Sequence, residues 1–341
     1  MYYQVDETND YYKSGGVKVI VNVDQKLIRD TVIDCLGSLY LKPDAYTEER
    51  FYYQSTLQIY LEALGIPNYM KISPSVETLF FIHNKHIMTI PYQNIHFHLK
   101  DRQPYSFYFR ELVDRIVVQK NGGLCYEQCA LMYHVYKTIG FDVKILFATV
   151  TKGHEHTFNP YEFQSHAFLM IKVDGQEYLV DGWFGSEAPC YPLAIDLGKD
   201  EQIIQINKYI KFCLVRYENY YELKQWYGNY WERQYVFFRP LVFKDIVEIY
   251  DQYLRNIYQE YYSPIRDKYM LIGKSSQYGF FQAFMIPSAY QFVAYNVSFI
   301  HGVAYYKKYE NLEKFKDEVY WESGIIIPDF YYIKTDSQIE K

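Results

Sequence analysis

The spacing of apolar residues changes once along this chain, near residue 140. Before that point apolar side chains recur every three or four residues, which is typical of helices with one buried face. This spacing predicts helices over residues 50–64, 73–88, 106–120 and 125–139. From Phe141 onward apolar and polar residues alternate, which indicates strands. The predicted strands cover residues 141–150, 164–173, 176–183, 201–226 and 229–239.

The last hundred residues mix the two patterns. A strongly amphipathic helix is predicted over residues 243–262, and strands are predicted over residues 269–273, 278–286 and 289–300. The order therefore predicts an α+β protein: a small helical bundle, then an antiparallel barrel or open sheet, then mixed structure. Residues 17–23 and 25–40 predict one more strand and helix, in an N-terminal extension to which we assign no role.

Two of the predicted strands flank Asp174-Gly175, a signal for a two-residue type I′ hairpin turn. In the register that this turn sets, His166 lies opposite Trp183 and is the diagonal neighbour of Asp181. Diagonal neighbours share a face and lie about 7–8 Å apart. We therefore expect His166 and Asp181 to point the same way and to hydrogen-bond on a largely apolar face. The alternative is a core histidine and a strand-end aspartate that never meet.

A cysteine stands at the start of the last helix of the predicted bundle. Cys125 follows Gly122-Gly123-Leu124, and the helical spacing after it ends at Gly140. A helix N-terminus lowers the pKa of a thiol, and glycines allow backbone amides to approach an oxyanion. Cysteine, histidine and aspartate are the parts of a nucleophilic triad. The alternative is a buried structural cysteine, which is the usual state of a free thiol.

Four short motifs resemble those of the arylamine N-acetyltransferase family, in the same order. They are IPYQN before the loop, NGGLCYE around Cys125, SHAFLMI at His166 and YLVDGWFG at Asp181. The resemblance runs over about residues 55–330 and implies that these three residues are catalytic. It also implies the fold: a helical bundle carrying the nucleophilic cysteine, an antiparallel β-barrel and a C-terminal α/β lid, around a cysteine-protease-like core.

The resemblance suggests four parts of the chain. These are an N-terminal extension of unknown role (1–50), the helical bundle with the catalytic cysteine (51–140), the β-barrel with the histidine and aspartate (141–240) and the α/β lid (241–341). Three aromatic residues near the inferred cleft, Tyr92, Trp183 and Phe184, are candidates for substrate binding. Core packing is the alternative for all three.

The chain departs from the family pattern at four positions, one of which is Cys129, where the family often has an asparagine. Asn121 stands where the family has an arginine, and Gln93 stands where it has a glutamate. The family's two side chains are expected to pair, so we expect a hydrogen bond between the two amides here. Trp183 stands where the family has a glycine, and a tryptophan is expected to crowd or reshape the cleft.

Composition and charge exclude several other classes. The net charge is −6, and the sequence has no basic cluster typical of a nucleic-acid surface. No apolar run approaches the length of a membrane span, and the five cysteines are odd in number and irregularly spaced. We therefore expect a globular, cytoplasmic protein with no membrane or nucleic-acid partner. His154 and His156 lack the partners of a zinc motif, so we expect no metal.

The resemblance implies an acyltransferase. Acetyl-CoA would be the acyl donor, and the acceptor would be a small amine such as an arylamine or hydrazine. Cys125 would carry the acyl group, His166 would move the proton and Asp181 would orient the imidazole. Three alternatives stay open: a cysteine hydrolase or transglutaminase-like enzyme, an amide synthase that closes macrolactams, and a non-catalytic binding module on the same fold.

Overall fold

The computed structural model describes residues 45–67, 72–99, 103–152, 164–206, 210–259, 264–276, 279–286, 291–298 and 303–328. Contacts divide the chain into two units, Met1–Glu49 and Arg50–Lys341. Apart from the first residues of α2, the elements below belong to the second unit. The strand and helix predicted within residues 17–40 lie outside the described residues.

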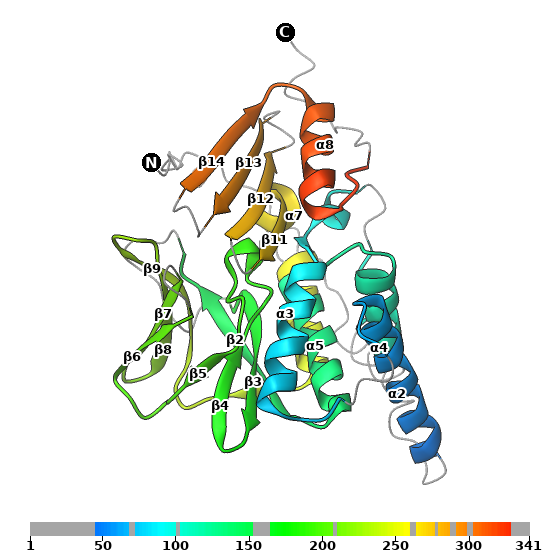
Figure 1. The fold of residues 1–341 in the computed structure, drawn as a ribbon, viewed down its shortest axis with the longest axis vertical. Coiled ribbons are helices and arrows are strands. Elements are labelled where there is room, and N and C mark those ends of the chain that lie inside the picture. The colour runs from blue at the N-terminus through cyan, green and yellow to red at the C-terminus, as the bar shows by residue number, and fades with distance from the viewer. Residues whose placement is uncertain are drawn as a thin grey trace. The chain divides into compact units, whose positions relative to one another are not determined.

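The first half of the described chain is helical (Figure 1). Its helices are α2 (Ala45–Ala63), α3 (Val76–Thr89), α4 (Phe109–Leu112) and α5 (Cys125–Ile139), with a 3-10 turn at Ile95–His98. A π-helical segment, Val113–Val118, continues directly from α4. Two of the predicted boundaries have a clear local cause. The Ser75 hydroxyl accepts a hydrogen bond from the Thr78 amide at the start of α3, and Gly140 ends α5 with φ +108°.

The middle of the chain forms an antiparallel sheet that nearly closes into a barrel. Its strands are β2 (Asp142–Val150), β3 (His166–Val173), β4 (Gln176–Val180), β5 (Leu193–Ile195), β6 (Glu201–Gln205), β7 (Lys211–Arg216), β8 (Tyr220–Trp226), β9 (Trp231–Phe238) and β10 (Phe243–Lys244). The order is β5-β4-β3-β2-β9-β8-β7-β6, and β10 pairs with β2. The Gln202 side chain links the two end strands, because it donates to the Ala194 carbonyl at 2.9 Å.

A second antiparallel sheet forms from the C-terminal region. It has the order β1-β11-β12-β13-β14, so the short strand β1 (Tyr92–Gln93) joins it from the helical part of the chain. The other strands are β11 (Met270–Ser276), β12 (Gly279–Ile286), β13 (Gln291–Ser298) and β14 (Val303–Tyr309). The helices of this region are α6 (Ile246–Leu254), with its π-helical continuation Arg255–Gln259, α7 (Pro264–Asp267) and α8 (Leu312–Ser323).

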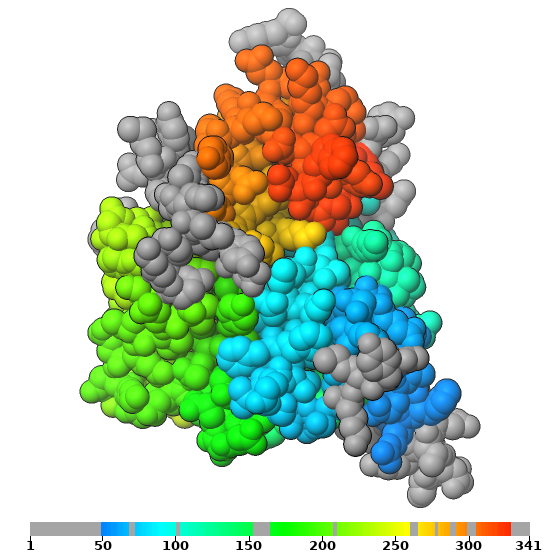
Figure 2. Space-filling view, in the orientation of Figure 1, coloured from blue at the N-terminus to red at the C-terminus, as the bar shows by residue number. Residues whose placement is uncertain are grey.

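The side chains of the described residues pack into three apolar cores. The first joins the helices to one face of strands β2, β3 and β4 and contains Cys125 and Trp183. The second fills the barrel, and the third lies between α8 and the C-terminal sheet. In the space-filling view the atoms of α3 (cyan) lie directly against those of the barrel (green) (Figure 2). The nucleophile candidate therefore lies in the core that helices and barrel share.

The predicted α+β fold, with helices first, a nearly closed barrel next and α/β structure last, is confirmed. Three details of the pattern were wrong or incomplete. The helix expected over 106–120 begins only at Phe109 and becomes π-helical at Val113. The helix expected over 243–262 begins at Ile246, because residues 243–244 pair with β2. Strand β14 and helix α8 were not predicted. The division at residues 50, 140 and 240 stays a prediction.

Candidate active site

The β3–β4 hairpin carries the histidine and the aspartate. Asp174 and Gly175 have φ values of +50° and +80°, as a type I′ turn requires, and Val173 pairs with Gln176 as expected. His166 Nε2 lies 2.9 Å from Asp181 Oδ2, and both side chains are buried. The expected contact between the two residues is therefore present. The bond to the carboxylate occupies Nε2 and leaves the other ring nitrogen, Nδ1, for a thiol.

A backbone amide fixes the second oxygen of Asp181. The Trp183 N–H donates to Asp181 Oδ1 at 3.3 Å, so both carboxylate oxygens have a donor. Hydrogen bonds of this kind compensate the burial of a carboxylate. The tight turn at Gly182 permits this arrangement, since a Cβ there would lie 2.3 Å from Ile87 Cγ2. The carboxylate is therefore held by His166 of β3 and by the backbone that follows β4, while α3 packs against Gly182.

Cys125 is the first residue of α5, as predicted. Gly122 is needed because the loop runs against the segment leading to β1. Gly122 has φ +67°, and a Cβ there would lie 2.3 Å from the Pro91 carbonyl oxygen. The Gly123 N–H donates to that oxygen at 3.3 Å, and the Gly123 carbonyl accepts from Gln93 N–H at 3.1 Å. The loop is thus fixed by backbone hydrogen bonds to Pro91 and Gln93.

The electrostatics of the thiol differ from what the helix position alone predicts. Burial raises the pKa of Cys125, and this effect outweighs the backbone N–H of Tyr126, which lowers it. The charges of Asp181 and Glu127 raise the pKa of Cys125 further. A buried thiolate is costly by itself. It is compensated only when a neighbouring base, such as an imidazole, takes the proton and becomes a cation.

Two of the three candidate substrate residues lie beside the hairpin and the loop. The Phe184 ring is 4.9 Å from the His166 ring, edge to face. Tyr92 forms an isolated β-bridge with Gly123. Burial raises the pKa of Tyr92, and the charge of Cys125 raises it further. Trp183 is fully buried, and its indole N–H donates to the Ala167 carbonyl at 2.7 Å. It is a core side chain anchored to β3, so its effect on substrate binding stays a prediction.

The expected amide pair between Asn121 and Gln93 is not present. The Asn121 side chain is exposed and donates to Gln119 Oε1 at 3.1 Å. Gln93 is buried and accepts from the Ile95 N–H. The two side chains therefore face different surroundings. The expectation was wrong because the local hydrogen bonds of each amide decide where its side chain points.

Several residues around the site were not predicted. His86 Nε2 and Gln128 Oε1 are 3.1 Å apart, and Gln128 Nε2 donates to the Gly123 carbonyl at 2.7 Å. This chain of buried groups supports the loop before Cys125. The Tyr235 ring lies 5.2 Å from the His166 ring. Burial and then the Asp181 charge raise the pKa of Tyr235. Its only sequence signal was the alternation of a strand, which does not distinguish a site residue.

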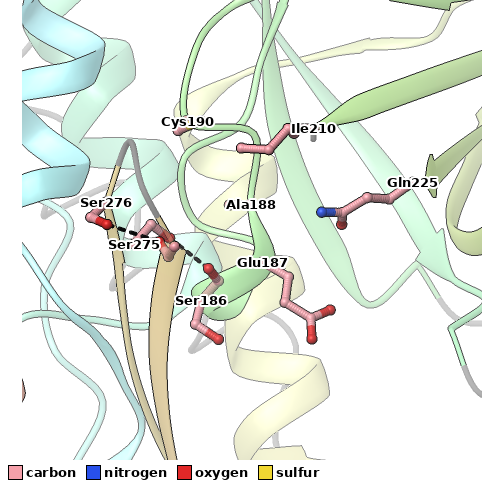
Figure 3. Close-up of a pocket in the computed structure, with 9 residues that line it drawn as sticks. Ser186, Glu187, Ala188, Cys190, Ile210, Gln225, Ser275 and Ser276 are labelled. Atoms are coloured by element: carbon pink, nitrogen blue, oxygen red, sulfur yellow. Dashed lines mark hydrogen bonds between the residues drawn. The ribbon is translucent and has the colours of Figure 1, made fainter. Parts of the chain in front are cut away.

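A small hollow, with a cavity volume of about 10 Å³, lies beside the loop that follows the aspartate (Figure 3). Ser186, Glu187 and Cys190 line it from that loop, Gln225 from β8, and Ser275 from β11. The Ser275 hydroxyl donates to the Ser186 carbonyl at 2.7 Å, which ties the loop to the C-terminal sheet. The three triad candidates are not among the lining residues.

The sequence led us to expect no metal site. Within the described ranges there is no group of three or more His, Cys, Asp or Glu arranged to hold a metal ion. His154 and His156 lie outside the described residues. Cys129 is fully buried in the first core, one turn after Cys125. Of the helices in the described part of the chain, none is long and apolar enough to cross a membrane.

Comparison with known proteins gives the family. The model of the N-acetyltransferase family matches residues 75–271, which is more than half of the chain and includes all three triad candidates. The chain belongs to the arylamine N-acetyltransferase family. Among curated relatives, the chicken pineal gland isozyme NAT-10 is 29% identical over 127 residues, which are 37% of this chain and 42% of that protein.

A bacterial relative gives a longer match. The arylamine N-acetyltransferase / N-hydroxyarylamine O-acetyltransferase of Salmonella typhimurium is 24% identical over 182 residues, 53% of this chain and 58% of that enzyme. The chain therefore spans about half the length of the curated arylamine N-acetyltransferases that it matches.

Solved structures show the same fold over a longer range. The arylamine N-acetyltransferase of Mycobacterium marinum, solved in complex with CoA, superposes with a TM-score of 0.65 at 19% identity. The match covers 79% of this chain and 92% of that one. The Bacillus cereus enzyme, described as having a Cys-His-Glu triad, superposes with a TM-score of 0.63 at 21% identity, covering 80% and 98%.

Proposed function

We propose that this arylamine N-acetyltransferase family member transfers an acetyl group from acetyl-CoA to the amino group of an arylamine or hydrazine-type acceptor. The reaction is ping-pong and passes through a thioester on Cys125. The donor is carried over from the family and from the neighbouring enzyme solved with CoA. Two features of the site, a thiol at a helix N-terminus and a buried His–Asp pair, fit both half-reactions.

In the first half-reaction His166 Nδ1 takes the proton of the Cys125 thiol. The sulfur attacks the carbonyl carbon of the thioester, and the C–S bond to CoA breaks. CoA leaves as a thiol with the proton from the imidazolium. In the second half-reaction the amine attacks the acetyl-Cys125 carbonyl, His166 accepts the amine proton, and the restored thiol leaves. Asp181 holds the ring in both steps and stabilises the imidazolium.

The observation that supports this most is the hydrogen bond between His166 Nε2 and Asp181 Oδ2, in a buried setting. It fixes the ring so that Nδ1 faces away from the carboxylate and is free to serve the thiol. The Tyr126 N–H, which lowers the pKa of Cys125, is a suitable donor to the oxyanion of the tetrahedral intermediate. Tyr92 and Phe184 are the side chains we propose to contact the acceptor.

A reduced compartment suits this chemistry, since a thiol nucleophile has to stay free. Cys125, Cys129, Cys190 and Cys213 are free cysteines. We keep a cytoplasmic location as part of the proposal.

The first experiment is intact-protein mass spectrometry after mixing with acetyl-CoA. We expect one added acetyl group on the wild type, and its removal by an arylamine. Cys125→Ala is expected to show no adduct, whereas Cys213→Ala, which removes a buried barrel cysteine, is expected to acetylate like the wild type. An adduct that persists in Cys125→Ala would refute the assignment of the nucleophile.

The same experiment separates the alternatives. If no adduct forms but iodoacetamide alkylates Cys125 quickly, the thiol is active toward another donor. Longer acyl thioesters and amides then test the amide synthase, hydrolase and transglutaminase-like interpretations. If no adduct forms and alkylation is slow, the binding-module interpretation replaces acetyl transfer.

A further inference from the structure

A buried carboxylate lies two residues after the nucleophile. Glu127 is in the first turn of α5 and is fully buried. Its Oε2 accepts the Leu124 N–H at 2.8 Å, so it holds the residue directly before Cys125. Gly123 packs against the same oxygen, since a Cβ there would lie 3.3 Å from it. Glu127 therefore sets the backbone on the approach to the thiol.

The charge partner of this carboxylate is Arg115. Arg115 Nη2 lies 2.8 Å from Glu127 Oε1, and the arginine side chain is only 12% exposed. His96 Nε2 lies farther from the same oxygen, at 3.9 Å, and burial lowers the pKa of His96 to about 4, so it is neutral near pH 7. Among the described residues, Arg115 is thus the cation that balances Glu127. A buried carboxylate without such a partner is strongly unfavourable.

Arg115 also contacts the loop through its backbone. It lies in the π-helical segment Val113–Val118, and its carbonyl accepts the Asn121 N–H at 3.3 Å. Its guanidinium lies over the Tyr105 ring, 4.0 Å from the centroid, which fixes the side chain in place. Single π-helical turns are rare and occur often at functional sites. The segment therefore holds both ends of the stretch 121–127, with Cys125 between them.

We propose that Arg115 is a positioning residue for the nucleophile: through Glu127 and its own carbonyl it fixes the loop before Cys125 and balances the buried charge beside the thiol. This inference rests on the proposed function, in which Cys125 is the nucleophile. The pair supplies a charged contact that Asn121 and Gln93 do not form in this chain. Glu127 belongs to the motif around Cys125, whereas Arg115 lies outside that motif.

The test compares the direction in which each substitution changes the thiolate population of Cys125. Burial raises the pKa of Cys125, and the carboxylates of Asp181 and Glu127 raise it further. In Arg115→Met the charge of Glu127 acts on the thiol without compensation, so the thiolate is less populated. In Glu127→Gln the arginine charge is uncompensated and favours the thiolate, while the amide oxygen still accepts the Leu124 N–H. Asp181 and His166 are the same in every variant.

The measurement is the alkylation rate of Cys125 by iodoacetamide at one pH, followed by peptide mass spectrometry. We expect Arg115→Met to react about tenfold more slowly than the wild type and Glu127→Gln about tenfold faster, since one pKa unit is a tenfold change in thiolate. Arg115→Met/Glu127→Gln is expected to return to within about threefold of the wild type. Arg110→Met, which removes an exposed arginine of α4, is the matched control and is expected to leave the rate unchanged.

Opposite signs in the two single variants distinguish charge balance from packing, because a packing defect moves both rates the same way. Equal directions, or a double variant as slow as Arg115→Met, would overturn the proposal. If Arg115→Met does not fold, Glu127→Gln and the double variant decide it alone. Alkylation needs no acyl donor, so a wild type that forms no acetyl adduct refutes the proposed function without deciding this inference.

Discussion

At the scale of single residues, the geometry of Asp181 determines what the site tolerates. One oxygen binds the imidazole and the other accepts the Trp183 N–H. An asparagine keeps the shape but places an N–H₂ donor and a neutral oxygen where two acceptors are needed. A glutamate keeps the charge but is one methylene longer in a fully buried position. The two substitutions therefore separate charge from length.

We predict that Asp181→Asn lowers the single-turnover rate of Cys125 acetylation by about 10³–10⁴-fold, because the neutral side chain no longer orients and stabilises the imidazolium. Asp181→Glu is expected to retain more activity than Asp181→Asn, as charge is kept; the Bacillus cereus neighbour is described with a glutamate in its triad. Asp174→Asn, in the exposed hairpin turn, serves as the control. An Asp181→Asn enzyme that is faster than Asp181→Glu would show that charge is not what the site requires.

The contact between His166 and Asp181 is the one that sequence reasoning predicted correctly. The two-residue turn at Asp174-Gly175 sets a register, and the register alone was enough to bring His166 to Asp181. Contacts that depend on distant segments were not accessible in this way. The Arg115–Glu127 pair depends on a π-helical turn, and the position of Tyr235 depends on which strand pairs with β2. Neither the π-helical turn nor the choice of the strand that pairs with β2 produces a periodic pattern of apolar residues in the sequence.

At the scale of elements, the loop before α5 and the hairpin turn use glycine for different reasons. Gly175 has φ +80°, and a Cβ added there would meet no atom within 4 Å, so only backbone conformation requires it. Gly122 has φ +67° and also lies against the Pro91 carbonyl. The loop therefore needs glycine both for its conformation and for its close approach to the segment before β1.

We predict that Gly175→Ala costs about 1–2 kcal/mol of unfolding free energy and leaves the acetylation rate of folded protein near that of the wild type. Gly122→Ala is expected to cost more and to slow acetylation at least about tenfold, because the loop before Cys125 has to move away from Pro91. Urea unfolding and single-turnover acetylation measure the two effects. Equal losses of rate in both variants would contradict the role of the Gly122 contact.

At the scale of the whole molecule, the order of helices, barrel and mixed sheet followed from apolar spacing, but the joins between these regions did not. Strand β1 has only two residues and pairs with β11, far along the chain. Strand β10 takes the first two residues of what the sequence presented as one long helix. Such short elements are set by the backbone donors and acceptors of the partner strand, so local spacing carries little information about them.

Buried histidines give the whole molecule a predictable acid sensitivity. His83, His86, His96 and His134 are each less than a tenth exposed, and they are four of the nine histidines in the chain. Burial lowers the pKa of His86 to about 3 and of the other three to about 4, from 6.5. Between pH 6.5 and about 4 the unfolded chain therefore binds protons that the folded protein excludes, so stability falls as the pH falls.

The loss of stability depends on how far the pH lies below the pKa of histidine in the unfolded chain. At pH 5 each histidine removes about 2 kcal/mol, because about 1.5 pH units separate this pH from the unfolded pKa. His134 is a suitable site to test one contribution: its ring stacks on Phe109, Nε2 is buried without a hydrogen bond, and phenylalanine removes only the bond to the Phe107 backbone. We predict that His134→Phe loses less stability between pH 6.5 and pH 5 than the wild type, by about 1.5 kcal/mol in urea unfolding. Tyr133→Phe, on the same helix, is expected to follow the wild-type pH dependence. An unchanged pH dependence in His134→Phe would mean that this histidine takes up its proton in the folded state, which its burial argues against.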